Sequence, residues 1–178
     1  MHVFLLAAAA ALVQSPVSAS VVKPGTIAIV AADSRTTSPA ITKTFTDAVQ
    51  RTLLRTPFLP LPDQNHSLYV AKVEVSQTQR GVVRSGNDRS DRPGMVAGLG
   101  GLSLTLPSRK DQLHGLIVTR LKVTVSLRRD SDVVWTGQAT TVRASGTRTG
   151  DPSVVAAALS DALLAWFPRQ LPGPLSVP

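Results

Sequence analysis

The chain has 178 residues, of which 43% are hydrophobic and only 4% aromatic, and its 19 Lys and Arg outnumber 11 Asp and Glu. The length suits a single domain, and the formal charge of +8 predicts a basic surface. The absence of cysteine excludes disulfides, zinc–thiolate sites, iron–sulfur clusters, thiol catalysis and a lipid anchor on an acylated cysteine.

The N-terminal segment has the layout of a secretory signal peptide. The apolar run Phe4–Val13 is followed by the breaker Ser15-Pro16 and by small residues up to Ala19. The run is too short to span a bilayer, which takes about 20 apolar residues. We expect residues 1–19 to be removed after Ala19, which leaves a periplasmic chain that starts at Ser20. The alternative is a buried N-terminal helix.

The first half of the mature chain predicts a strand, a helix and a second strand. Thr26–Ala31 is a short apolar run between turn residues, as in a buried strand. Ser38-Pro39 is an N-cap signal, and apolar residues then recur at helical spacing as far as Arg55. Residues 56–63 contain three prolines and should be extended or turning. Leu68–Val75 then alternates like a half-buried strand, with Lys72, Glu74 and Ser76 on its polar face.

The second half predicts a glycine-rich insertion, a hairpin and a second helix. We expect residues 84–115 to be a mobile insertion, with a short strand at Leu102–Leu106. Leu116–Leu127 and Val133–Ala144 alternate about a polar turn, which favours an antiparallel hairpin. Its predicted inward residues include Leu121, Val123, Val133, Trp135 and Ala139. Asp151-Pro152 repeats the cap signal before an apolar helix over 154–167.

The order of these elements predicts an α+β two-layer sandwich. Because each strand has one apolar and one polar face, both helices should pack on the same side of an antiparallel or mixed sheet of about four to five strands. We expect one α+β domain over residues 20–168. Residues 169–178 are proline-rich and are predicted to form a disordered tail.

Three features together resemble a family of bacterial envelope proteins built on a domain of unknown function, many of them lipoproteins. They are the signal peptide, the hairpin sequence with Trp135, Gly137 and Ala139 in a Trp-x-Gly-x-Ala pattern, and the terminal helix that closes on Phe167-Pro168. The glycine-rich stretch Gly94–Gly101 has a counterpart in that family. The resemblance implies a Gram-negative envelope origin, but the family has no assigned catalytic residues. The chain also lacks the cysteine that its lipoprotein members acylate.

The usual catalytic and cofactor motifs are not recognisable. Gly98–Gly101 precedes an extended stretch rather than a helix, so it does not match a phosphate-binding loop. His66 and His114 fall in predicted loops with no spacing that demands a metal or a catalytic triad. Glu74 is the only glutamate, which offers little for paired-carboxylate catalysis. We therefore expect no enzymatic activity, no cofactor and no metal.

The basic residues gather in two places. Arg80, Arg84, Arg89 and Arg92 lie along the predicted insertion, and Arg120, Lys122, Arg128 and Arg129 lie on the polar face and the turn of the hairpin. The second set is the candidate anion-contacting surface, because such cations suit phosphate and carboxylate partners. Nucleic acid is not expected, since no stacking aromatics accompany the cations. The alternative is a merely solvated basic surface.

These observations favour an exported, non-enzymatic, envelope-associated interaction module. Its expected partner is an envelope protein or an anionic envelope surface, contacted without a membrane span or lipid anchor. One alternative is a binding protein that holds an anionic ligand, such as a lipid head group, between the insertion and the sheet. A third interpretation is a hydrolase with a cryptic Ser–His–Asp set.

Overall fold

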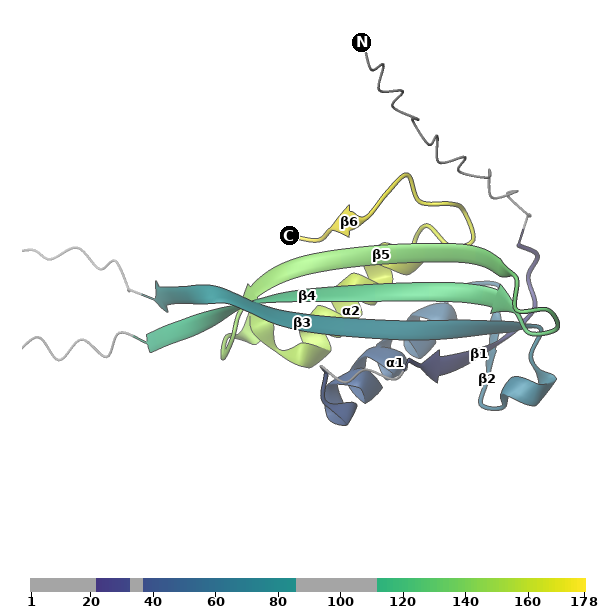
Figure 1. Ribbon diagram of the computed structural model, residues 1–178, viewed down its shortest axis with the longest axis horizontal. Helices are drawn as coiled ribbons and strands as arrows, with labels where there is room; N and C mark the ends of the chain where they lie inside the picture. The colour runs from purple at the N-terminus through teal and green to yellow at the C-terminus, as the bar shows by residue number, and fades with distance from the viewer. Residues whose placement is uncertain (1–21, 33–36, 86–111) are drawn as a thin grey trace, which may run out of the picture.

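The computed structural model describes residues 22–32, 37–85 and 112–178, which form one sheet with two helices (Figure 1). The strands follow the order β2-β1-β3-β4-β5-β6, with antiparallel pairs β3–β4 and β4–β5 and parallel pairs elsewhere. The α+β class is thereby confirmed, with six strands in a mixed sheet instead of four to five. The strands are β1 (Thr26–Ala31), β2 (Leu59–Leu61), β3 (Tyr69–Ser85), β4 (Gln112–Leu127), β5 (Val133–Ala144) and β6 (Leu175–Ser176).

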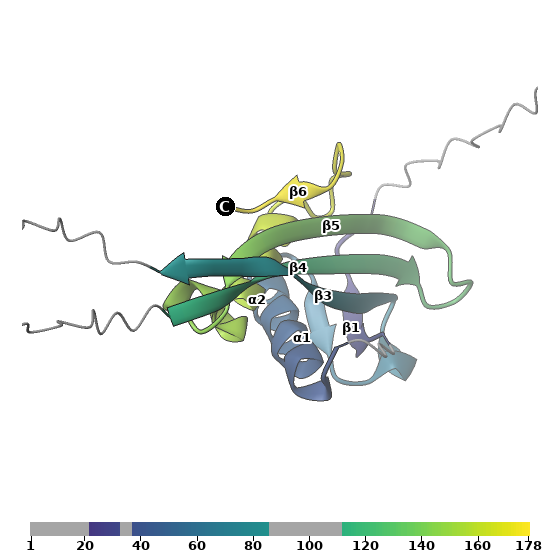
Figure 2. The same cartoon turned by 60° about the vertical axis from the view of Figure 1, so that its left-hand side comes forward.

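Both helices begin at the predicted cap signals and pack on one side of the sheet (Figures 1 and 2). Helix α1 (Pro39–Leu53) is capped by the Ser38 hydroxyl, which accepts from the backbone N–H of Ile41. Helix α2 (Pro152–Leu164) is capped by the Asp151 carboxylate, which accepts from the backbone N–H of Ser153. With α1 of 15 residues and α2 of 13, neither helix in the described residues is long and apolar enough to cross a membrane.

The inner face of the sheet forms the core because the strand residues alternate as predicted. Tyr69, Ala71, Val73 and Val75 of β3 are buried, and Leu121, Val123 and Val125 of β4 pair with strand neighbours in the same layer. On β5, Trp135 and Ala139 are buried as expected.

The prediction for Val133 was wrong, because this side chain is 52% exposed. The register between β4 and β5 shifts between Val125 and Ser126, so that Val125 pairs with Trp135 and Ser126 with Val133. Val134 is the extra residue of this bulge, and it is buried in place of Val133.

Strands β3 and β4 run further than the sequence predicted. They pair as far as Ser85 and Gln112, so the ends of the expected 84–115 insertion belong to a two-stranded ribbon that continues past the helices (Figure 1). His114 therefore lies in β4 and not in a loop. The predicted strand Leu102–Leu106, the glycine cluster and the signal peptide lie outside the described residues.

The C-terminal segment is folded onto the sheet, contrary to the predicted disordered tail over 169–178. Leu175–Ser176 forms β6, which pairs with Ala139 and Thr140 of β5. The indole N–H of Trp135 donates to the Arg169 carbonyl (2.8 Å), and the Thr141 hydroxyl donates to the Val177 carbonyl (2.7 Å). These partners lie more than 30 residues away in the sequence, which is why local composition did not reveal them.

Candidate functional site

The outer face of the sheet, opposite the helices, carries the polar half of each alternating strand. Its pairing places Lys72 opposite Thr124, Glu74 opposite Lys122 and Ser76 opposite Arg120. On the far side of β4, Lys122 faces Gln138 and Arg120 faces Thr140. We call this surface, defined by Lys72, Glu74, Arg120, Lys122, Gln138 and Thr140, the basic sheet face.

Positive charge is in excess on the basic sheet face. Three cations share it with one carboxylate, Glu74, and Lys72 and Arg120 are exposed. The Lys122 ammonium lies 3.5 Å from a Glu74 oxygen, with both side chains about 40% exposed (44% and 40%). This distance is long for a charge-assisted hydrogen bond, and solvent weakens such a pair further. The face therefore presents cations to any anion that approaches it.

The structure divides the four cations that the sequence had grouped. Arg120 and Lys122 lie together on the basic sheet face, whereas Arg128 and Arg129 lie in the turn after β4. The Arg128 side-chain N–H donates to the carbonyl of buried Ser67 (2.8 Å), so this arginine joins the β4–β5 turn to the start of β3. Arg129 is exposed in the turn.

Lys72 was missed as a member of the site, although its outward direction was predicted. The alternation in β3 gives the face of Lys72, but its position beside the β4 cations depends on the β3–β4 register. That pairing joins residues separated by about fifty positions, and the sequence had left the arrangement of the strands open.

A groove borders the basic sheet face where the chain returns after α2. It has a volume of about 290 Å³ and lies between the outer side of β4–β5 and the segment Leu171–Pro174, which we call the C-terminal arch. Lys122, Thr136 and Gln138 line it from the strands, and Leu171, Gly173 and Pro174 line it from the arch.

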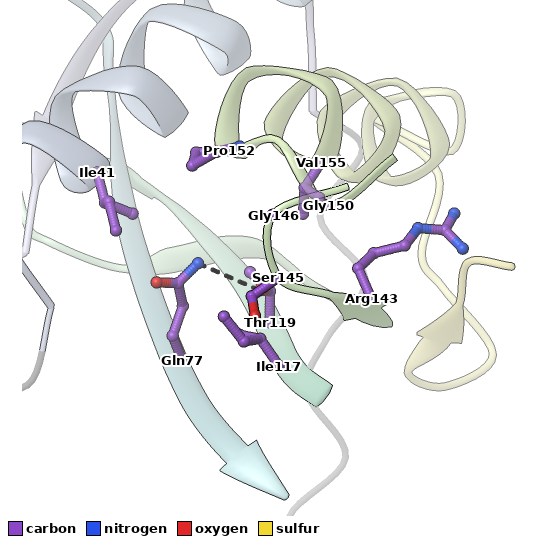
Figure 3. Close-up of a pocket in the computed structure, with 10 residues that line it drawn as sticks. All are labelled: Ile41, Gln77, Ile117, Thr119, Arg143, Ser145, Gly146, Gly150, Pro152 and Val155. Carbon is purple, nitrogen blue, oxygen red and sulfur yellow. Dashed lines mark hydrogen bonds between the residues drawn. The ribbon is translucent and has the colours of Figure 1, made fainter. Parts of the chain in front are cut away.

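A second pocket of about 210 Å³ lies on the inner side, between the first turns of both helices and the end of the sheet (Figure 3). Ile41, Ile117 and Val155 make much of its lining apolar. The Gln77 amide donates to the Thr119 hydroxyl (3.3 Å). The Arg143 guanidinium points away from the pocket and donates to the Pro178 carbonyl (Figure 3). Among the described residues that line this cavity, the charged side chain is Arg143, and its guanidinium is turned away from the cavity (Figure 3).

The two described histidines belong to different parts of the fold. His66 is exposed in the 3-10 turn Gln64–His66, with its Nδ1 2.7 Å from the Asp63 carboxylate. Hydrogen bonds from the Asn65 backbone and from His66 lower the pKa of Asp63. His114 contacts the Ser145 carbonyl (2.6 Å) beside the β3–β4 ribbon. Within the described ranges, no group of three His, Asp or Glu side chains could hold a metal ion.

Comparisons with known proteins give a resemblance in fold only. No model of a known protein family matches the chain, and no curated protein matches it in sequence. Among solved structures, it is similar to the PelC dodecamer from Paraburkholderia phytofirmans, with 17% identity, a TM-score of 0.48, and coverage of 80% of this chain and 86% of that one. A leucine-to-methionine variant of that PelC dodecamer gives 18% identity, a TM-score of 0.47, and coverage of 80% and 87%.

Proposed function

We propose that the protein is an exported, non-enzymatic module that binds anionic surfaces of the bacterial envelope through its basic sheet face. The observation that carries the proposal is that the two helices cover only one face of the sheet, while the other face carries the cations. Both helices cover the inner face (Figure 2), and the basic sheet face carries Lys72 on β3 and Arg120 and Lys122 two residues apart on β4, with Glu74 as its one carboxylate. An open, gently twisted array of cations complements a surface with many anionic groups better than it complements one small ion.

The occupant we propose for this face is a bilayer surface rich in anionic lipid. Each cation near such a surface contributes about 1 kcal/mol to binding. Thr124 is paired with Lys72, and Gln138 and Thr140 of β5 lie beside Lys122 and Arg120, so their hydroxyl and amide groups can donate to head-group oxygens next to the cations. An acidic envelope protein is the other partner class, and the vesicle experiment separates the two.

The double variant Lys72→Gln/Arg120→Gln should bind phosphatidylglycerol vesicles about 30-fold more weakly than the wild type at low salt, because two contributions of about 1 kcal/mol are lost. Vesicle co-sedimentation measures this difference. Salt should weaken wild-type binding as the Debye length falls to about 8 Å near physiological ionic strength. Arg128 is left unchanged because it supports the fold through Ser67.

The matched control is Lys43→Gln/Arg51→Gln, which removes the same charge from exposed positions on α1, in the helical layer. It should bind vesicles nearly as the wild type does. Equal losses in both double variants would show that net charge alone governs binding. If the wild-type protein does not bind these vesicles at low salt, the lipid surface is ruled out as the partner. An acidic envelope protein would then be the partner to seek.

Export is the second part of the proposal and rests on the apolar run Phe4–Val13 and the small residues before Ser20. The protein recovered from the periplasm of a Gram-negative host should begin at Ser20, as determined by N-terminal sequencing. A soluble cytosolic product that retains Met1 would contradict export. Leu6→Arg, which interrupts the apolar run, should leave the precursor uncleaved.

A further inference from the structure

We propose that the groove beneath the C-terminal arch is a specific binding site for the phosphate of a phosphoester. This inference rests on the function proposed above and assigns a specific anionic ligand to one groove at the edge of the basic sheet face. The groove is about 290 Å³, near the lower end of the range of small-molecule pockets, which starts at about 300 Å³.

The arch is held in place on both sides of the groove. Before it, the Trp135 indole N–H donates to the Arg169 carbonyl (2.8 Å), and the Gln170 amide donates to the Val134 carbonyl (3.2 Å). After it, the Val177 N–H donates to the Thr140 carbonyl (2.9 Å), next to the β5–β6 pairing. A ligand would meet a wall that is already ordered, so little conformational entropy would be lost on binding.

The polar groups of the groove suit a phosphate oxygen cluster. Lys122 lines the groove and carries an ammonium with three donors, which lies on the Glu74 side of β4, and Thr136 and Gln138 add a hydroxyl and an amide from β5. Lysine binds phosphate as a point charge, and its three N–H donors can reach separate phosphate oxygens. Because a phosphate carries several acceptor oxygens, it can accept from all three side chains once the Lys122 ammonium turns from Glu74 toward the groove.

The opposite wall suits the organic part of a phosphoester. Leu171 and Pro174 are apolar, and a methyl group added at Gly173 would meet no atom within 4 Å, so the arch leaves open space there. A carbon backbone such as glycerol can lie against this wall while its phosphate faces Lys122. The same chemistry occurs in a soluble phosphoester and in a phospholipid head group.

The Glu74 carboxylate would compete with a bound phosphate for the Lys122 ammonium. Its carboxylate lies 3.5 Å from the Lys122 ammonium on the neighbouring strand, so a bound phosphate would share the cation with it and be repelled by it. Removing the charge of Glu74 should therefore strengthen binding, which is an effect opposite in sign to that of removing Lys122.

The experiment uses the mature protein and two probes, glycerol 3-phosphate and vesicles containing phosphatidylglycerol, with binding followed by calorimetry and co-sedimentation. We expect saturable binding of at least one probe, with an affinity lowered about tenfold or more by Lys122→Gln, retained by Lys122→Arg and raised several-fold by Glu74→Gln. Binding of glycerol 3-phosphate would identify a soluble phosphoester as sufficient. Saturable binding of the vesicles alone would identify the lipid head group as the source.

The exposed ion pair Lys43–Asp47 of α1 provides the matched controls Lys43→Gln and Asp47→Asn, which should change neither affinity. The inference is overturned if neither probe binds saturably, or if Lys122→Gln loses no more affinity than Lys43→Gln. If Lys122→Gln weakens vesicle binding no more than the loss of Lys72 or Arg120 does, the groove is refuted as a specific site. The proposed function would then stand. Binding that depends on Lys122 alone and resists salt would refute the extended basic sheet face and leave the groove.

Discussion

Replacing Trp135 by alanine should lower the free energy of unfolding by about 3–5 kcal/mol, the usual cost of truncating a large aromatic side chain in a core. Trp135 is 1% exposed, and its ring meets that of Phe167 edge to face at 5.1 Å. Its indole N–H also holds the Arg169 carbonyl, so the variant loses a hydrogen bond to the C-terminal segment. Since a domain is stable by only about 5–15 kcal/mol, the midpoint of urea denaturation should fall markedly.

Trp135→Phe separates the packing of this side chain from its hydrogen bond. Phenylalanine keeps an aromatic ring against Phe167 but cannot donate to Arg169. We expect a smaller loss of stability than for alanine, together with faster hydrogen exchange in the Arg169–Val177 segment. A Trp135→Ala midpoint equal to that of the wild type would show that the side chain does not lie in the core.

The layered architecture could be predicted because its signals are local. Period-two alternation in β3 and β4 depends only on backbone geometry, so Val73 and Leu121 were correctly placed in the core. The helix starts could be predicted for the same reason, since Ser38 and Asp151 satisfy N–H groups within three residues of themselves.

The elements that were missed depend on distant partners. Strand β2 contains Pro60, which can lie only on an edge of the sheet, and it pairs solely with β1 in the described residues. Strand β6 has two residues and is held by β5. Neither has a hydrophobic period long enough to be recognised, and the composition of both segments is that of a turn or a tail.

The candidate site, like the fold, could be predicted only where its signals are local. Alternation placed Arg120 and Lys122 outward, but it could not show that Arg128 is bonded to Ser67 or that Lys72 lies beside the β4 cations. The groove needed the C-terminal arch, which comes from a segment whose composition predicted disorder. The site depends on the register between strands and on the contacts of the C-terminal segment with distant residues. A single sequence encodes both only indirectly.

Gly137 should be intolerant of any side chain, although glycine is a poor strand residue and most replacements in a strand would be expected to stabilise it. A Cβ at this position would lie 2.5 Å from Trp135 Cη2 and 2.8 Å from Leu163 Cδ1, and both of these side chains are fully buried. The indole of Trp135 lies over the glycine two residues later, which gives the Trp-x-Gly pattern a steric reason. Gly137→Ala should therefore cost about 1–3 kcal/mol, and Gly137→Val about 3 kcal/mol or more.

Gly173→Ala is the matched control for this prediction, because its added methyl group meets no neighbour. Its free energy of unfolding should stay within about 0.5 kcal/mol of the wild type. If the clash with the indole is the cause, Trp135→Phe should recover part of the stability that Gly137→Ala loses, so that the two losses are not additive in a double-mutant cycle. Simple additivity would show that Gly137 matters for its backbone alone. A Gly137→Val protein as stable as the wild type would show that the indole can move aside at no cost.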